Sequence, residues 1–599
     1  MAKTHDYILG INAYDHDVSA CLLRDGAIAV AVEKERITRQ KHAGGFFQEC
    51  IDYCLKAEGI TLDDVDLVVR NCYVLPVEEL EVRMIYQGDI ADRERAQAAK
   101  SPLYLPKLNK VMTVSHHLAH AYSAFAPSPF EEGVVMVVDG VGSYASDIKE
   151  PGQLTAGVNP LARESESYYS FRGSELTPLK KVWLEPCRGL LSDEFFNMDG
   201  LGALYSRVSS YIFADWNKCG EVMGLAPYGR PNNFRKLIEL NADGELHVTP
   251  WDAEFNQPWM PDGKKKWEAD PAMRHWEDMA WRIQHDSEEV LLARARWLRE
   301  TTGAKNLVLA GGVALNCVAN GRIVRETGFD NVWIQPAAGD NGISIGCAYY
   351  GRLAVQKKPR SSVMKRATLG IEYPDEAVRR VGNPLLVTRK TFNGAGESIC
   401  RETAKLLADG KVFGWFQGRS EFGPRALGDR SILGDPRRPE MKDILNKRVK
   451  FRQAFRPFAP IVIYERAKDI FVGEDESPFM LRAKQVKSEW KDKIPAIVHV
   501  DGTARVQTVR REDNPRMYDL LVEFEKLTGV PVLVNTSFNI KGEPIVETPQ
   551  HAMNCFIYTG IDYLALHDTL VAKNVLYKVL APFIKVYYES KAYARDEAD

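Results

Sequence analysis

The chain has 599 residues and a mass of 67.4 kDa, and its 78 Lys and Arg residues nearly balance its 81 Asp and Glu residues. A formal charge of −3 argues against a dedicated nucleic-acid-binding protein, which usually carries a basic excess. Hydrophobic residues make up 45% and charged residues 27%, so the composition is that of a globular protein and excludes a disordered or collagen-like chain.

The first 70 residues predict three consecutive strands, then a helix and a further strand. Short apolar runs are bounded by polar turns, and Asp25-Gly26 is a hairpin turn signal. The expected elements are strands at 7–13, 18–23 and 27–32, a helix at 45–58 and a strand at 65–69. Three strands followed by alternating helix and strand are typical of a ribonuclease-H-like half-domain.

A similar succession partly recurs after residue 132. One strongly apolar strand ends in Asp-Gly, and a later one ends in Gly-Gly. The expected elements are a strand at 133–139, a long amphipathic helix at 275–301, a strand at 306–310, a helix at 313–327 and a strand at 332–335. Strands that alternate with helices imply a mostly parallel sheet, which binds ligands at the carboxyl ends of its strands.

Two stretches interrupt this pattern. Residues 144–275 are irregular and rich in Tyr, Trp, Pro and Ser, and we expect an insertion that shapes a pocket. Residues 356–365 are polar and basic, which is typical of a linker. The linker divides the chain into an N-terminal domain at 1–358 and a C-terminal α/β domain at 366–599.

The sequence contains no signal for secretion or membrane insertion. Its first 17 residues contain no apolar run of the kind that a signal peptide needs, and no window holds 18 consecutive apolar residues. The ten Cys residues are dispersed and form no CxxC pair, which fits a reducing compartment. We therefore expect a cytoplasmic protein with no membrane partner.

Four side chains form a candidate metal site. His116 and His120 stand four residues apart, so on a helix their imidazoles lie on one face. Such a pair alone more often belongs to a hydrogen-bonded polar face. Asp139, however, ends a buried strand, and Asp340 lies in a Gly-Asp-Asn-Gly loop after another strand. Two imidazoles and two carboxylates suit Fe, Mn or Zn.

Glycine-rich loops follow the same strands. Glycines let backbone amides approach a phosphate, and a helix N-terminus adds its dipole. Each loop alone is often only a tight turn, but their order on one duplicated fold favours a nucleotide site. The candidate residues are Gly140, Gly311, Gly312 and Asn316. No Walker A or GxGxxG motif is present, which disfavours a P-loop protein.

A basic segment at 419–456 holds eleven Lys and Arg residues against five Asp and Glu residues. Charge runs are usually solvated, but here the basic residues alternate with Phe, Pro and Gly, which favours a rigid cleft. Arginine binds phosphate through two parallel hydrogen bonds, and lysine binds it as a point charge. With two later stretches, the candidates for binding a polyphosphate are Arg425, Lys450, Arg452, Arg456, Arg505, Ser537 and Asn539.

The order of the motifs resembles a known family. The motifs are AYDHD, EKERITRQKH, HHLAH, VVDGVG, GEVMGLAPYG, GGVALN, GDNG, FGPRALGDRS, KFRQAFRPFAP, HVDGTARVQTV and VNTSFNIKGEPIV. No single motif identifies the family. The ordered series spans nearly the whole chain and is similar to the NodU/CmcH-type O-carbamoyltransferases of antibiotic and nodulation-factor biosynthesis.

The resemblance implies a fold. The N-terminal domain would be a duplicated ribonuclease-H-like, that is actin- and sugar-kinase-like, domain. The C-terminal domain would be a YrdC-like α/β domain, whose KxR and SxN signatures match Lys450 with Arg452 and Ser537 with Asn539.

The resemblance also implies a two-step reaction. In the C-terminal domain, carbamoyl phosphate and ATP with Mg(2+) would give carbamoyl-adenylate. In the N-terminal domain, its carbamoyl group would pass to a substrate hydroxyl. The family implies Fe(2+) at this second site, although the ligand set alone would also take Mn or Zn.

These steps suggest roles for single residues. Arg425 and Lys450 are the candidate catalytic residues of the first step, because they would stabilise phosphoryl displacement. His16, in the first strand-turn, is the candidate base for the acceptor hydroxyl, since a neutral imidazole near pH 7 suits that task. A simple turn histidine is the plainer alternative. Lys41 and His42 are expected to line the same mouth.

Two other functions are weighed against this one. A fused tRNA threonylcarbamoyl-adenosine synthase is disfavoured by the near-neutral charge, because tRNA docking normally needs a basic face. A non-enzymatic actin-like nucleotide switch would not need the basic pocket. We expect ATP, carbamoyl phosphate and a small hydroxyl acceptor as partners, and no nucleic acid; the acceptor and the oligomeric state stay open. Aromatic residues of the insertion suit an acceptor pocket or a core equally well: Tyr168, Tyr169, Phe171, Trp183, Phe195, Phe196 and Tyr205.

Overall fold

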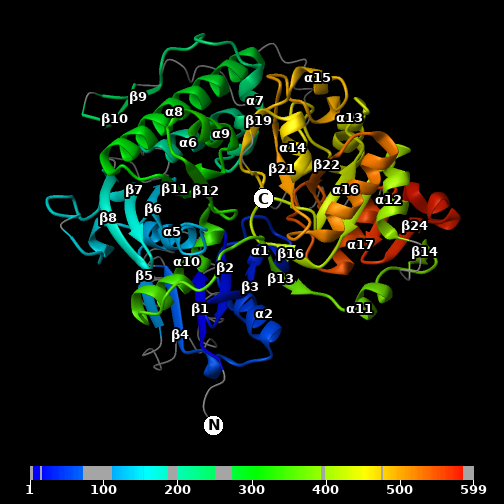
Figure 1. The fold of residues 1–599 in the computed structure, drawn as a ribbon, viewed down its shortest axis with the longest axis horizontal. Coiled ribbons are helices and arrows are strands. Elements are labelled where there is room, and N and C mark those ends of the chain that lie inside the picture. Colours follow the sequence, from blue (N-terminus) through cyan, green and yellow to red (C-terminus); the bar gives the residue numbers. More distant parts are fainter. Residues whose placement is uncertain are drawn as a thin grey trace. The chain divides into compact units, whose positions relative to one another are not determined.

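The computed structural model describes residues 5–13, 16–71, 111–152, 154–185, 199–241, 243–249, 273–392, 398–473 and 476–583 (Figure 1). The chain forms two compact units. The N-terminal unit comprises Met1–Thr38 and His42–Lys365, and the C-terminal unit comprises Arg39–Lys41 and Arg366–Asp599.

The first sheet of the N-terminal unit has five strands in the order β3-β2-β1-β4-β5. β2 is antiparallel to β1 and to β3, whereas β4 is parallel to β1 and to β5. The elements are β1 (Tyr7–Asn12), β2 (Ser19–Arg24), β3 (Ala27–Glu33), α1 (Lys34–Thr38), α2 (Gln48–Glu58), β4 (Leu67–Asn71) and β5 (Val111–Val114). β1 is buried along its whole length, as expected for the central strand of a covered sheet.

The second sheet repeats this arrangement with the order β8-β7-β6-β11-β12. β7 is antiparallel to β6 and to β8, whereas β11 is parallel to β6 and to β12. The strands are β6 (Glu132–Val138), β7 (Arg163–Arg172), β8 (Glu175–Leu184), β11 (Asn306–Ala310) and β12 (Asn331–Ile334). Both sheets thus share strand order and strand directions, which confirms the predicted duplicated ribonuclease-H-like fold.

Helices α5 and α10 follow the last strand of each sheet and pack against each other. Close approaches at two glycines let α10 pack on its neighbours. A Cβ on Gly346 of α10 would lie 1.8 Å from the carbonyl oxygen of Ala119 in α5, and a Cβ on Gly10 of β1 would lie 2.0 Å from that of Ser344 in α10. These two helices and the other helices and short strands described in this unit are α5 (His116–Phe125), α6 (Leu201–Phe213), α7 (Cys219–Leu225), β9 (Ile238–Leu240), β10 (Leu246–Val248), α8 (Met273–Thr302), α9 (Cys317–Glu326) and α10 (Ile343–Tyr350).

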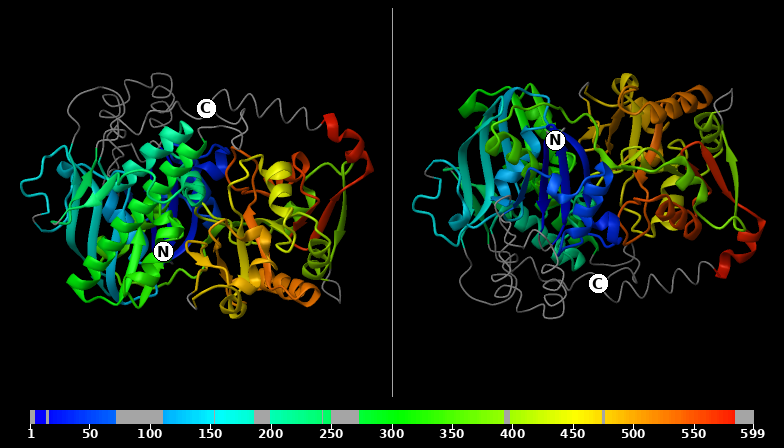
Figure 2. Two further views of the ribbon diagram at one scale, coloured as in Figure 1. Left: turned by 90° about the horizontal axis from the view of Figure 1, so that it is seen from above. Right: turned by 90° about the horizontal axis from the view of Figure 1, so that it is seen from below.

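The stretch 144–275 is more regular than its composition predicts. The long hairpin of β7 and β8, coloured cyan in Figures 1 and 2, completes the second sheet, and α6 and α7 follow it. Polar and apolar residues are buried alike along β7, so the strand lacks the alternation that a sequence pattern would reveal.

The aromatic residues of this stretch belong mainly to the core. Tyr168, Tyr169 and Phe171 are buried on β7, and the buried Tyr205 donates a hydrogen bond to Gln284 at 2.7 Å. Trp183 is half-buried. Phe195 and Phe196 lie outside the described residues.

The C-terminal unit is built on an eight-stranded mixed sheet in the order β14-β24-β23-β15-β17-β22-β18-β21, with two separate strand pairs, β13-β16 and β19-β20. The strands are β13 (Thr368–Glu372), β14 (Val387–Thr391), β15 (Phe413–Phe416), β16 (Arg419–Glu421), β17 (Arg430–Gly434), β18 (Ala459–Ile463), β19 (Ala483–Gln485), β20 (Thr503–Arg505), β21 (Gln507–Val509), β22 (Val532–Ser537), β23 (Tyr563–Leu566) and β24 (Thr569–Lys573). The unit is α/β as predicted, and its likeness to YrdC-type proteins stays a prediction.

Helices cover this sheet and bury a single large apolar core. They are α11 (Asp375–Arg380), α12 (Ile399–Ala408), α13 (Met441–Leu445), α14 (Tyr464–Ile470), α15 (Ser488–Lys491), α16 (Pro515–Thr528) and α17 (Pro549–Tyr558). The sequence sets the ends of α16 locally. Asn514 caps its first turn by accepting the N–H of Met517 at 3.1 Å, and Gly529 ends it in the left-handed conformation.

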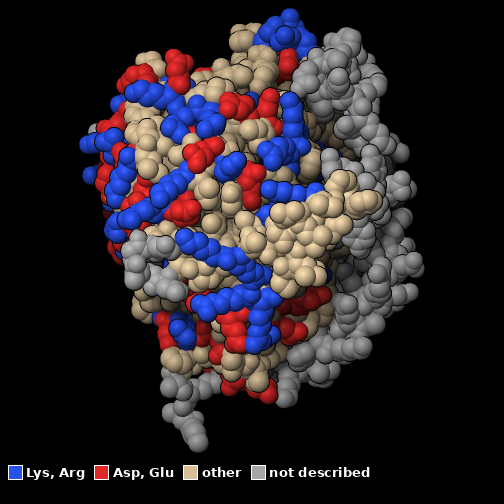
Figure 3. All heavy atoms as spheres, turned by 90° about the vertical axis from the view of Figure 1, so that its right-hand side faces the viewer, with Lys and Arg blue, Asp and Glu red and all other residues tan. Residues whose placement is uncertain are grey.

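Basic and acidic side chains are interspersed on the face of the molecule drawn in Figure 3, in keeping with the near-zero net charge. Within the described ranges, no helix has both the length and the apolar character that crossing a membrane requires.

Candidate functional site

The four predicted metal ligands meet in the N-terminal unit. His116 and His120 lie in the first five residues of α5, Asp139 directly follows β6, and Asp340 begins a short 3-10 helix (Asp340–Gly342) in front of α10. Each residue offers one ligand atom, and these four atoms lie within 4.8 Å of one another. The structure thus brings together all four residues that the sequence singled out.

The spacing of these atoms suits a common ion. Nε2 of His116 lies 3.0 Å from Oδ2 of Asp139 and 3.4 Å from Oδ1 of Asp340, and Nε2 of His120 lies 3.5 and 3.4 Å from the same oxygens. Ligands about 2.1 Å from an ion are about 3.0 Å apart in octahedral geometry and about 3.4 Å apart in tetrahedral geometry. Among the described residues, neither ring nitrogen of the fully buried His120 has a hydrogen-bond partner. The donor set therefore fits a divalent cation.

The cluster strongly favours positive charge. Burial alone would lower the pKa of His116, but the carboxylates of Asp340 and Asp139 raise it to about 10. Burial alone would raise the pKa of Asp139, but His116 and His120 hold it well below its usual range. Two carboxylates in a buried setting bind positive charge tightly, whether it comes as protons or as a metal ion.

His16 lies beside this cluster, shortly after β1. Its Nε2 atom lies 3.8 Å from Oδ2 of Asp340, and its Nδ1 atom lies 2.9 Å from Oδ2 of Asp17. The other oxygen of Asp17 lies 2.9 Å from Nδ1 of His42. The imidazole of His16 also packs against the indole of Trp216, with 5.1 Å between ring centroids. One nitrogen of His16 is thus fixed by a carboxylate, and the other faces the cluster.

The charge on His16 depends on the same carboxylates. Burial would lower its pKa, but Asp17 and Asp340 raise it to about 9. The imidazole therefore accepts a proton from a hydroxyl only where a second positive charge offsets these carboxylates. Asp17 was not singled out in the sequence, although a carboxylate next to a candidate base in a polar turn is a signal that could have found it.

The glycine-rich loops help to hold the cluster. Gly311 has a φ of +89°, and a Cβ there would lie 2.2 Å from the backbone of β6. The N–H of Gly312 donates to Oδ1 of Asp139 at 2.7 Å, which leaves Oδ2 for the histidines. The backbone of Gly140 closely approaches Gly202 of α6. Close packing thus accounts for Gly311, and the contact of Gly140, Gly311 and Gly312 with a nucleotide stays a prediction.

Asn316 has structural partners. Its Oδ1 atom accepts the N–H of Ala319 at 3.1 Å, which caps α9, and its Nδ2 atom donates to Gln284 at 3.0 Å. A helix cap of this kind is a common task for asparagine. Both of these hydrogen bonds are to protein groups, and the contact between Asn316 and a nucleotide stays a prediction.

In the C-terminal unit, Lys450 is buried against the predicted SxN residues. It ends a π-helical turn (Asn446–Lys450) after α13. Its Nζ atom donates to Oδ1 of Asn539 at 2.6 Å and to Oγ of Ser537 at 3.1 Å. Burial, together with the positive charges of Arg452 and Arg456, holds the pKa of Lys450 well below its usual range. These surroundings of Lys450 therefore favour the arrival of negative charge.

The predicted arginines have different surroundings. Nε of Arg452 donates to Oδ1 of Asn446 at 2.9 Å, and its guanidinium stacks on Phe458 at 4.5 Å, so the group is rigidly held. Arg456 is half-buried within electrostatic reach of Lys450. Two further predicted residues are also half-buried, Arg425 in the loop after β16 and Arg505 at the end of β20.

Glu421, which the sequence analysis missed, shapes the loop that carries Arg425. Its Oε1 atom accepts the backbone N–H groups of Leu427, Asp429 and Arg430 at 2.7, 2.9 and 3.1 Å. A single acidic residue in front of a Gly-Pro-Arg-Ala-Leu-Gly loop is the signal that could have revealed it.

Lys41 and His42 are predicted to line one mouth with His16. His42 contacts Asp17, which in turn holds His16. Lys41 belongs to the C-terminal unit and lies within electrostatic reach of Lys450, and its place at the mouth stays a prediction.

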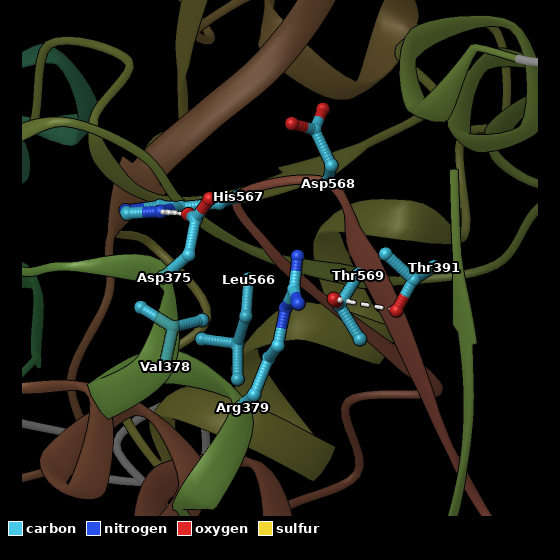
Figure 4. A pocket seen from close by; sticks show the side chains of 8 residues that line it. All are labelled: Asp375, Val378, Arg379, Thr391, Leu566, His567, Asp568 and Thr569. Atoms are coloured by element: carbon cyan, nitrogen blue, oxygen red, sulfur yellow. Dashed lines mark hydrogen bonds and ion pairs between the residues drawn. The ribbon is translucent and has the colours of Figure 1, made fainter. Parts of the chain in front are cut away.

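A small surface pocket in the C-terminal unit contains none of the predicted site residues (Figure 4). It is lined by Asp375, Val378, Arg379, Thr391, Leu566, His567, Asp568 and Thr569. His567 and Asp375 form an ion pair at its edge, 2.8 Å apart, and two threonine hydroxyls bond to each other. His567 pairs with Asp375, and Asp568 pairs with Arg516 outside the pocket, so we assign the pocket no role.

Comparisons with known proteins agree with the motif order. Residues 7–349 match the family model for the carbamoyltransferase N-terminus, and residues 404–573 match that for the carbamoyltransferase C-terminus. An uncharacterized protein of Synechocystis sp. is 38% identical over 95% of this chain and 97% of its own length. The nodulation protein NolNO of Sinorhizobium fredii is 33% identical over 96% of this chain and 82% of its own length. Nodulation protein U of Rhizobium tropici is 42% identical over 93% of this chain and 95% of its own length.

These matches cover both units and the whole motif series, so the resemblance drawn from the sequence is confirmed. The chain belongs to the carbamoyltransferase family and is a carbamoyltransferase.

Proposed function

We propose that the chain is an ATP-dependent O-carbamoyltransferase that acts in two steps. In the first, water hydrolyses carbamoyl phosphate to carbamate and phosphate, and the carbamate attacks the α-phosphorus of ATP to give carbamoyl-adenylate and pyrophosphate. In the second, a hydroxyl oxygen of a specialised metabolite attacks the carbamoyl carbon, and AMP leaves. The C-terminal unit would carry the first step and the N-terminal unit the second.

The C-terminal cluster suits the first step. ATP and carbamoyl phosphate are polyanions, and the half-buried Arg452 and Arg456 offer positive charge beside the buried Lys450, whose own charge the bound anions would stabilise. Such preorganised charge stabilises phosphoryl displacement. Ser537 and Asn539 hold Lys450 in place and would add neutral hydrogen bonds to the nucleotide or to its Mg(2+).

The N-terminal cluster suits the second step. His116, His120, Asp139 and Asp340 would hold the metal, for which Fe(2+) is the first candidate and Mn or Zn are the alternatives. When bound, such an ion supplies Lewis-acid polarisation. His16 would take the proton of the acceptor hydroxyl at Nε2, because Asp17 occupies Nδ1 and fixes the orientation of the ring.

The observation that carries the proposal is the convergence of two imidazoles and two carboxylates, with His16 at their edge 3.8 Å from Asp340. An actin-like switch that only binds a nucleotide needs neither this cluster nor a buried lysine in a second unit.

The test is to incubate the purified protein with carbamoyl phosphate, ATP and Mg²⁺ and to measure pyrophosphate and carbamoyl-adenylate by mass spectrometry. We expect both products without any acceptor. Adenylate formed only with threonine and bicarbonate would instead indicate a threonylcarbamoyl-adenosine synthase. No pyrophosphate under either condition would exclude both enzymes.

A further inference from the structure

The N-terminus of α5, the helix that carries both candidate histidine ligands, is capped by side chains that lie outside the helix. Ser115, at the N-cap position of α5, makes no side-chain cap bond and instead donates its hydroxyl to Glu150 at 3.0 Å. The N–H of His116 donates to Oγ of Ser143 at 2.9 Å, and the N–H of His117 donates to Oε2 of Glu164 at 3.3 Å. The first turn of α5 is therefore held by β7 and by the loop after β6.

Glu164 is the centre of this arrangement. The same Oε2 atom accepts the N–H of Ser143 at 3.0 Å, so one carboxylate oxygen binds both α5 and the residue that caps His116. Backbone bonds reinforce the contact, since the N–H of Gly142 donates to the carbonyl of Glu164 at 2.7 Å. A Cβ on Gly142 would lie only 2.7 Å from Cβ of Glu164 and from Cδ2 of His117. The second glycine of the VVDGVG motif thus serves this close approach.

A buried lysine keeps the carboxylate charged. Nζ of Lys181 lies 2.5 Å from Oε1 of Glu164, and the two side chains expose 1% and 0% of their surface. Lys181 also reaches Oε1 of Glu150 at 2.8 Å and the hydroxyl of Tyr169 at 2.9 Å. A buried ion pair of this kind adds little net stability compared with apolar residues of the same shape. Its benefit here lies in the geometry that it imposes on α5.

We propose that Glu164, held by Lys181, is the positioning residue of the metal cluster. It acts on His116 through Ser143 and on the whole first turn of α5 through the N–H of His117. The inference rests on the proposed metal-dependent function, because it assigns Glu164 the task of setting the position of two ligands. Outer partners of metal ligands typically change metal affinity about 10- to 100-fold when they are removed.

The test compares three variants of the full-length protein in Co²⁺ binding, measured by competition with a chromophoric chelator and by the visible spectrum of the bound ion. Glu164→Gln keeps the shape but removes the charge. Ser143→Ala removes only the acceptor of the His116 N–H. Glu166→Gln is the matched control, because Glu166 lies on the same strand in an equally buried ion pair, 2.8 Å from Arg294.

We expect the first two variants to bind Co²⁺ about 10- to 100-fold more weakly, and the control to bind within threefold of the wild type. If Glu164→Gln fails to fold, Ser143→Ala alone decides. Wild-type affinity in both test variants, or an equal loss in the control, would overturn the inference. A wild-type protein that binds Co²⁺ through His116 and His120 but forms no carbamoyl-adenylate would remove the proposed function and leave the role of Glu164 intact.

Discussion

Nζ of Lys450 lies 2.6 Å from Oδ1 of Asn539, and the two residues expose 5% and 9% of their surface. We predict that Lys450→Met lowers the rate of pyrophosphate release about 100-fold or more, because removing one preorganised charge from a reacting site costs this much. Lys447→Met is the control, since Lys447 lies three residues earlier in the same helical turn and is exposed. A Lys450→Met enzyme as fast as Lys447→Met would exclude a direct role.

We also predict that the protein takes up a proton at Lys450 when ATP binds. Burial and the neighbouring arginines depress the pKa of Lys450, and a polyphosphate beside it raises that pKa again. Binding therefore increases the fraction of Lys450 in the ammonium form, because the neutral amine takes up a proton. Calorimetry in two buffers of different ionisation enthalpy measures this uptake. It disappears in Lys450→Met, and an unchanged uptake in that variant would assign the proton to another group.

We predict that removing both candidate histidine ligands removes the bound metal. A His116→Ala/His120→Ala protein should lose most of its bound iron, manganese or zinc, since half of the donor set is gone. Elemental analysis after dialysis against each metal checks this. His285→Ala, which removes an imidazole stacked on Trp281 outside the cluster, should keep the metal. A double variant that retains a stoichiometric ion refutes the assignment.

For His16 we predict a separation of the two steps. His16→Asn should form carbamoyl-adenylate at the wild-type rate, because His16 belongs to the other unit. Transfer to an acceptor should fall about 100- to 10,000-fold, the usual contribution of a general base. Single-turnover assays with isolated carbamoyl-adenylate measure the second step alone. Unchanged transfer there speaks against the base role.

We predict that the stability of the folded protein depends on pH through the carboxyl group of Asp429. Burial and the neighbouring Glu421 raise its pKa to about 8. Between pH 5 and 7 the folded protein keeps this proton, whereas the unfolded chain, with an ordinary carboxyl, releases it. The folded state therefore binds more protons, and the free energy of unfolding falls as pH rises, by about 1.4 kcal/mol per pH unit for this group.

Urea unfolding of the wild type and of Asp429→Asn at several pH values tests this. The variant should show a flatter slope between pH 5 and 7, while Asp469→Asn, a change at an exposed carboxyl, should follow the wild type. Parallel slopes for wild type and Asp429→Asn would mean that Asp429 is ionised in the folded protein.

Much of the fold could be predicted because its elements carry local signals. The helix expected at 275–301 is α8, and the strand expected at 306–310 is β11 with the same bounds. The hairpin of β7 and β8 could not be predicted, because Glu164, Glu166 and Lys181 are buried in ion pairs that no alternation of apolar residues reveals.

Part of the candidate site could likewise be predicted from the sequence, and part could not. The four candidate ligands were predictable, because each lies at a strand end or a helix start that the sequence marks. Glu164 was not, because its partners His117 and Ser143 lie in segments that only the folded chain brings together. Bonds from carboxylates to backbone N–H groups leave no pattern in the partner sequence, since every residue except proline carries the same N–H.

The duplicated halves do not contribute alike to the cluster. His16, His116 and His120 all come from the first half, whereas Asp139 and Asp340 both come from the second. An ion bound there is a cross-link that exists only when both repeats are folded, so it makes their unfolding more cooperative. At a free concentration one hundred times its dissociation constant, such an ion adds about 2.7 kcal/mol.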